Sequence, residues 1–151
     1  MTHVQKRVIA VVIAAMTALT GPAFAAGSSD GSSDEGTSAY AQAQTAIAAK
    51  DYAAAVPILT GLTRQKPRNA DAWNLLGFSS RKLGDFDTAA AAYAKALSLD
   101  PAHLGALEYQ GEMFVQLGQK AKARENLVRL QSLCDDCEEA EDLKAAIDAA
   151  G

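Results

Sequence analysis

The chain has 151 residues, 49% of them apolar, with 14 Lys and Arg against 18 Asp and Glu and a net charge of −4 at pH 7. An acidic chain is a poor candidate for binding nucleic acid, because that affinity depends on basic residues that contact phosphates. The sequence also offers no basic amphipathic helix that would hold an anionic membrane surface. We therefore expect neither a nucleic-acid partner nor a membrane-surface role.

The N-terminal segment 1–25 has the three zones of a secretory signal peptide. Lys6 and Arg7 form a basic start, residues 8–19 (VIAVVIAAMTAL) are apolar, and small residues end the segment at Ala25. The apolar run is shorter than the roughly 18 to 20 residues that span a bilayer, which favours cleavage over a retained anchor. We expect a cleaved signal peptide over 1–25, no membrane insertion afterwards, and a periplasmic or secreted mature chain.

Cleavage would leave 12 Lys and Arg against 18 Asp and Glu, a net charge of −6. The mature chain would then begin with residues 26–38, which are almost entirely Gly, Ser and acidic residues. Such a stretch buries too little apolar surface to offset its ordering entropy, so we expect a flexible linker. Residues 39–150 are then one domain with a single core.

This domain repeats itself at a fixed spacing and without insertions. Similar residues recur each time the position number rises by 34: Pro67 and Pro101; Gly77 and Gly111; Gly84 and Gly118; Ala55, Ala89 and Ala123; Leu59, Tyr93 and Leu127. Small residues such as Gly77 and Ala89 let two antiparallel helices approach closely, while large ones fill the gaps between them. Asp51 and Asp85 are expected to cap the second helix of their repeats.

The middle copy, DAWNLLGFSSRKLGDFDTAAAAYAKALSLDP (71–101), resembles the tetratricopeptide repeat (TPR) family. The positions that carry the resemblance are Trp73, Leu76, Gly77, Gly84, Phe86, Ala89, Tyr93, Ala96 and Pro101. Ser80 departs from the family pattern, which usually has an aromatic residue there. The resemblance covers three repeats, 36–69, 70–103 and 104–137, and residues 138–150 carry Ala140, Leu143, Ala146 and Ile147 on one stripe. We expect an all-α, right-handed superhelical TPR solenoid of three helix-turn-helix repeats with a C-terminal capping helix over 138–150.

The resemblance implies that the first helix of each repeat lines a concave groove that holds a partner's peptide or helix. By repeat position, the groove would carry Tyr40, Gln44, Ile47, Asn74, Phe78, Arg81, Lys82, Glu108, Tyr109, Glu112 and Gln116. A basic middle, Arg81 and Lys82, would lie beside an acidic edge and fit a segment with both charges. Each of these side chains could instead be an ordinary solvated group. The family's Lys and Asn set that clamps a C-terminal carboxylate is not reproduced.

Catalytic motifs are absent from the sequence. After signal cleavage His103 is the one histidine, and neither a Ser-His-Asp pattern, a phosphate-binding glycine loop nor HExxH occurs. His103 is interpreted as a turn residue, since a metal site needs converging neighbours. We expect no enzyme activity and no cofactor.

The two cysteines, Cys134 and Cys137, stand three apart before the capping helix. Cysteines of an exported protein usually oxidise, which favours a disulfide that pins this turn. A metal half-site, an intermolecular thiol and thiol-redox chemistry are the alternatives. The third repeat, the Cys pair and the tail DLKAAI (142–147) together resemble small exported bacterial TPR proteins. With the expected groove, this resemblance implies a non-catalytic adaptor or assembly factor of the bacterial cell envelope. A thiol-redox or metal-delivery accessory is the alternative, and self-association is left open.

Overall fold

The structure is a computed structural model that describes residues 32–151. The expected signal peptide over 1–25 lies outside the described residues. The chain from residue 32 onward contains no strand and folds into helices only: α1 Ser32–Ala48, α2 Tyr52–Gln65, α3 Ala70–Lys82, α4 Phe86–Leu99, α5 Leu104–Gln116, α6 Lys120–Leu133 and α7 Glu138–Ala149. The prediction of an all-α fold is confirmed.

The helix boundaries keep the repeat period of the sequence. Helices α2, α4 and α6 begin at residues 52, 86 and 120, and α3, α5 and α7 begin at residues 70, 104 and 138. The capping helix α7 therefore begins where the first helix of a fourth repeat would begin. It continues the register of α3 and α5 and is not an unrelated terminal helix.

The N-terminal boundary differs from the prediction. Residues 26–38 were expected to form a flexible linker and the domain to begin at residue 39, but α1 begins at Ser32. Gly36 is buried, and a Cβ atom there would meet the side chain of Lys66. Once α1 packs on the end of α2, each further residue of the helix adds a backbone hydrogen bond without a new nucleation cost. Polar composition alone does not report this packing.

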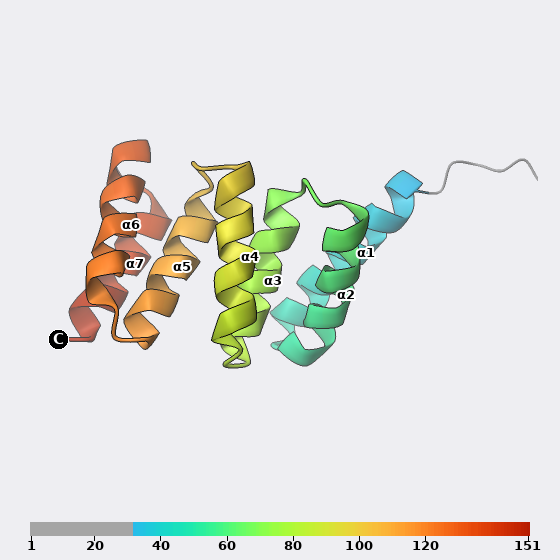
Figure 1. The fold of residues 1–151 in the computed structure, drawn as a ribbon, viewed down its shortest axis with the longest axis horizontal. Coiled ribbons are helices and arrows are strands. Elements are labelled where there is room, and N and C mark those ends of the chain that lie inside the picture. The colour runs from blue at the N-terminus through green and yellow to red at the C-terminus, as the bar shows by residue number, and fades with distance from the viewer. Residues whose placement is uncertain (1–31) are drawn as a thin grey trace, which may run out of the picture.

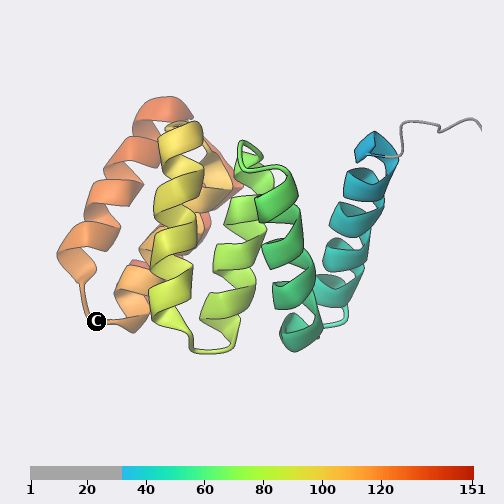
Figure 2. The ribbon, with the colours of Figure 1, turned by 45° about the vertical axis from the view of Figure 1, so that its right-hand side comes forward.

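The helices form two layers. Figure 1 shows α2 in front of α1 and α4 in front of α3, and Figure 2 shows the helices following one another in a row that starts at α1. Helix α3 packs on α5, and α5 packs on α7, whereas no comparable contact joins α1 to α3, α2 to α4 or α4 to α6 within residues 32–151. From α3 to α7 the layer of first helices is therefore the inner, more tightly spaced side of the row.

The turns between paired helices are built alike. The N–H groups of Asp51, Asp85 and Gln119 donate to the carbonyls of Ala46, Ser80 and Phe114 at 2.8, 2.9 and 2.7 Å, which closes each preceding helix. The residue before each donor has a positive φ: Lys50 (60°), Gly84 (81°) and Gly118 (70°). Asp51 and Asp85 then accept hydrogen bonds from the N–H groups of Ala54 and Thr88, so both predicted caps are confirmed.

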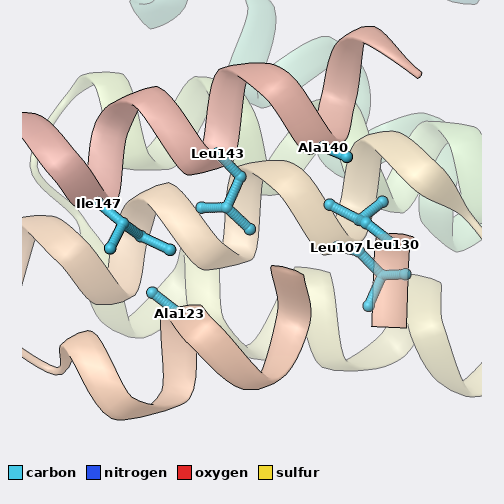
Figure 3. Packing of buried hydrophobic residues seen from close by; sticks show 6 residues of the cluster. All are labelled: Leu107, Ala123, Leu130, Ala140, Leu143 and Ile147. Atoms are coloured by element: carbon cyan, nitrogen blue, oxygen red, sulfur yellow. The ribbon is translucent and has the colours of Figure 1, made fainter. Parts of the chain in front are cut away.

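The last core cluster lies among α5, α6 and α7. Figure 3 shows its six buried side chains: Leu107, Ala123, Leu130, Ala140, Leu143 and Ile147. Three of the four residues of the predicted stripe on α7 are buried here, and Ala146 is half-buried. The capping role of α7 is therefore confirmed. Between residues 32 and 151 the structure has no helix with the length and apolar character needed to cross a membrane.

Candidate functional site

The centre of the predicted groove is a row of three half-buried aromatic side chains, Tyr52, Phe78 and Tyr109, which we call the aromatic row. The rings of Phe78 and Tyr109 have centroids 4.9 Å apart and are tilted by 48°. Tyr52 meets Phe78 edge-on, at 5.8 Å and 74°. The row joins α2, α3 and α5, and both separations suit favourable aromatic pairing. Tyr52 was not predicted, because it begins a second helix and only first helices were assigned to the groove.

Two cations lie along the aromatic row. The Arg81 guanidinium carbon is 5.6 Å from the Phe78 centroid and 5.8 Å from that of Tyr109, and the Lys82 Nζ is 5.2 Å from that of Phe78. Arg81 is only 4% exposed, and its Nη2 lies 2.5 Å from Oε2 of Glu112. Arg81 and Lys82, which were predicted together as the basic middle of the groove, therefore differ in their environments. Arg81 is a buried, paired charge that fixes the rings, and Lys82 is the exposed positive group.

Glu108 is the most unusual ionisable group of this face. It is 6% exposed, and burial raises the pKa of its carboxyl to about 8, with further increases from Glu112, Asp142 and Glu139. Arg81 acts in the opposite direction. Burial, followed by the Glu108 charge, likewise raises the pKa of Tyr109. Loss of hydration and repulsion between carboxylates both disfavour the ionised form of Glu108.

Glu108 opens into a surface hollow of about 160 Å³ between α5 and α7, which we call the acidic hollow. Its lining consists of Glu108, Tyr109, Glu138, Glu139 and Asp142. The three residues of α7 were not predicted as site residues, because α7 was assigned only a capping role. The repeat period could have found Asp142, since it stands one full period after Glu108, which itself stands one period after Asn74.

The other predicted groove residues are more dispersed. Tyr40 borders a separate hollow with Lys66, Asn69 and Asp71, and burial and Asp71 raise its pKa. Asn74 is buried beside Gly105 of α5.

Three further predicted residues lie outside the aromatic row. Gln44 and Gln116 are exposed, and no ring contact, hydrogen bond or ion pair in residues 36–151 joins them to the row. Ile47 packs on the core among α1, α2 and α3. The structure therefore brings together the predicted residues of α3 and α5, from Phe78 to Glu112.

His103 caps a helix, and the two cysteines are bonded to each other. The N–H of Ala106 donates to Nδ1 of His103 at 3.2 Å, so His103 caps α5, and its Nε2 lies 3.2 Å from a carboxylate oxygen of Asp71. Cys134 and Cys137 form a disulfide that joins the residue directly after α6 to the residue directly before α7. Within the described chain, no three His, Cys, Asp or Glu side chains converge as metal ligands would.

Two sequence matches report the repeat family. Residues 40–77 and residues 70–103 each match a family described as tetratricopeptide repeat, and the second match coincides with the middle repeat. The chain is a tetratricopeptide repeat protein. A search of curated protein sequences gives no match to this TPR chain.

Solved TPR domains share the fold. The TPR domain of Arabidopsis OM64 is 17% identical, covers 79% of this chain and 98% of its own length, and superimposes with a TM-score of 0.72. The TPR2B domain of yeast Sti1, solved in a pHsp70 complex, is 19% identical, covers 78% of this chain and 96% of its own length, and superimposes with a TM-score of 0.71. The first TPR of Spaghetti (RPAP3), bound to the HSP90 peptide SRMEEVD, is 18% identical, covers 78% of this chain and 96% of its own length, and superimposes with a TM-score of 0.70. At these identities the likeness establishes a shared fold.

Proposed function

We propose that this TPR protein is a non-catalytic adaptor or assembly factor of the bacterial cell envelope, which holds a segment of a partner protein against the inner helix layer. The observation that carries the proposal is the aromatic row on α2, α3 and α5. Half-buried aromatic side chains give a large, rigid contact area at low entropic cost, and such residues dominate binding energy at interfaces.

The charges around the row favour one orientation of the bound segment. Lys82 is exposed beside Phe78, whereas the carboxylates of the acidic hollow lie beyond Tyr109. A segment that crosses the row would gain from an acidic group near Lys82 and a basic group near α7. Such complementarity sets direction and specificity more than it sets affinity.

Two further observations support the proposal. The TPR domains of Sti1 and Spaghetti were solved with pHsp70 and with an HSP90 peptide, so this fold accommodates peptide segments. This support is an analogy at the level of the fold. The cell-envelope assignment rests on the sequence pattern of residues 1–25, which is that of a secretory signal peptide.

The experiment screens purified mature protein against a phage-displayed library of random short peptides and measures selected peptides by fluorescence anisotropy. Lys82→Glu is expected to weaken binding at least about tenfold, since it removes one charge contact and adds repulsion. Phe78→Ala is expected to weaken it further. Lys95→Glu makes the same charge change at an exposed position of α4 and is expected to bind as the unchanged protein does.

Selected peptides that bind equally well to Lys82→Glu and Phe78→Ala would overturn the groove assignment. The same conclusion would follow if the library yielded no peptide that prefers this protein to Lys82→Glu. Reversal of Arg81 is a poor test, because the variant would bury an unpaired acidic group next to Glu112.

A further inference from the structure

The acidic hollow contains a buried carboxyl group without a partner. Glu108 is only 6% exposed and lines the hollow, yet no hydrogen bond or ion pair within residues 36–151 satisfies its carboxyl oxygens. The residue as a whole is buried, but its carboxyl oxygens reach the surface at the hollow. They are therefore free to accept hydrogen bonds from a group that enters the hollow.

The surroundings of Glu108 are predominantly negative. Glu112 on α5 and Glu139 and Asp142 on α7 all act against its ionisation. Tyr109 and Glu138 complete the lining of the hollow. Arg81 of α3 is the one cation that favours the charged form, and its guanidinium is already paired with Glu112. The hollow thus concentrates negative charge that no cation of the described chain neutralises there.

We propose that the acidic hollow is a subsite for a cationic side chain, a lysine ammonium or an arginine guanidinium, of the bound partner segment. The inference rests on the proposed function, because it names the chemistry of one residue of the segment that the groove holds. The occupant would donate its hydrogen bonds to Glu108 and the α7 carboxylates, with the Tyr109 ring as an aromatic wall beside its charge.

Size and geometry favour a single organic cation. The hollow, at about 160 Å³, is smaller than the roughly 300 Å³ at which pockets for drug-sized ligands begin. The carboxylates do not converge as ligands of a metal ion would in the described chain. A long side chain can bring its charge into such a hollow while its methylene stem lies along the aromatic row.

Occupation of the subsite is coupled to a proton. With a pKa of about 8, Glu108 is mostly protonated at pH 7 in the unbound protein, and a neighbouring cation favours the ionised form. Binding therefore releases a proton below pH 8, and affinity rises with pH. For a group with this pKa the ionised fraction increases about tenfold between pH 7 and pH 9, which sets the expected change in affinity.

The test titrates 15N-labelled mature protein with N-acetyl-lysine-methylamide, using N-acetyl-norleucine-methylamide as the uncharged control of the same stem. The lysine probe is expected to shift amide signals of α5 and of the first turn of α7, with affinity about tenfold higher at pH 9 than at pH 7. Glu108→Gln should weaken binding at pH 9 at least about tenfold and abolish its pH dependence. Glu125→Gln, an exposed change on α6, should leave the affinity for the lysine probe and its pH dependence unchanged.

Equal shifts from the lysine and norleucine probes, or unchanged lysine binding to Glu108→Gln, would overturn the subsite. Glu108→Gln is expected to fold, because it replaces a carboxyl that is mostly neutral at pH 7 by a neutral amide. The two proposals also fail separately. If a selected peptide binds the aromatic row but tolerates replacement of every Lys and Arg by norleucine, the subsite is wrong and the adaptor function stands. If no peptide depends on Lys82 while the lysine probe still binds at α7, the adaptor function is wrong and the subsite stands.

Discussion

A Cβ atom on Gly77 would lie 2.6 Å from Cε1 of Tyr93, closer than real Cβ contacts come. The Tyr93 ring is fully buried between α3 and α4 and has no room to move away. The pair explains why the middle repeat keeps a small residue on its first helix and a large one on its second. A Cβ atom on Gly111 would likewise meet the side chain of Leu143. In the third repeat the large residue that packs on the glycine therefore lies on α7 and not on the second helix, α6.

Gly77→Ala is therefore expected to lower the free energy of unfolding by about 2 kcal/mol, the usual cost of forcing an extra methyl group into a packed core. Urea denaturation followed by circular dichroism measures it. Gly61→Ala is the matched control, because a Cβ there meets no atom within 4 Å. That change should stabilise the protein by about 0.5–1 kcal/mol through the better helix propensity of alanine. Equal effects of the two substitutions would contradict the packing argument.

Lys50 occupies a position that favours glycine. Its φ of 60° is left-handed, and its counterparts one and two repeats later are Gly84 and Gly118. We expect Lys50→Gly to raise the free energy of unfolding by about 0.5–1 kcal/mol, because relief of the left-handed strain exceeds the added entropy of glycine in the unfolded chain. Urea unfolding checks the value, and Gly84→Lys should show the opposite sign. A less stable Lys50→Gly variant would show that the turn carries no strain.

Features set by short-range chemistry could be predicted from the sequence. The caps Asp51 and Asp85 and the turn glycines act on backbone groups a few residues away, so their spacing located the helices. The middle repeat carries the most such markers, and its second helix begins directly after the predicted cap Asp85.

Features set by contacts between helices could not be predicted in the same way. The ion pair of Arg81 with Glu112 depends on how α3 lies against α5, so the sequence left Arg81 looking like a free positive charge. Helix α1 begins at Ser32, and its Gly36 lies against the side chain of Lys66, a contact between helices that polar composition does not reveal. Asp142 is an intermediate case. Its position one repeat period after Glu108 could be read from the sequence, but α7 lacks the Trp and Gly that mark the first helix of a repeat.

The disulfide between Cys134 and Cys137 closes a small loop at the start of α7. By the chain-entropy estimate, replacing both cysteines by serine should lower the free energy of unfolding by about 2 kcal/mol. Thermal unfolding of the oxidised protein and of the double variant measures the loss. Peptide binding to the aromatic row should persist in the folded variant. A variant that stays folded but loses its cellular activity would favour the alternative role as a thiol-redox or metal-delivery accessory.

Glu108 also predicts how stability changes with pH. Its pKa rises from 4.5 to about 8 on folding, so the folded state holds a proton that the unfolded state releases between these values. The free energy of unfolding should then decrease as pH rises from about 5 to 8. Glu108→Gln removes this titration. The variant should therefore have a higher free energy of unfolding than the unchanged protein at pH 8 and nearly the same value at pH 5.

Urea unfolding at pH 5, 6.5 and 8 measures both proteins, with Glu125→Gln as the control for loss of an exposed carboxylate. The difference between unchanged protein and Glu108→Gln should widen steadily with pH, whereas Glu125→Gln should follow the unchanged protein within about 0.5 kcal/mol. Parallel pH profiles for all three proteins would mean that Glu108 ionises in the folded state as readily as in water. The acidic hollow would then be hydrated in the unbound protein, and a bound lysine side chain would release no proton from Glu108 at pH 7.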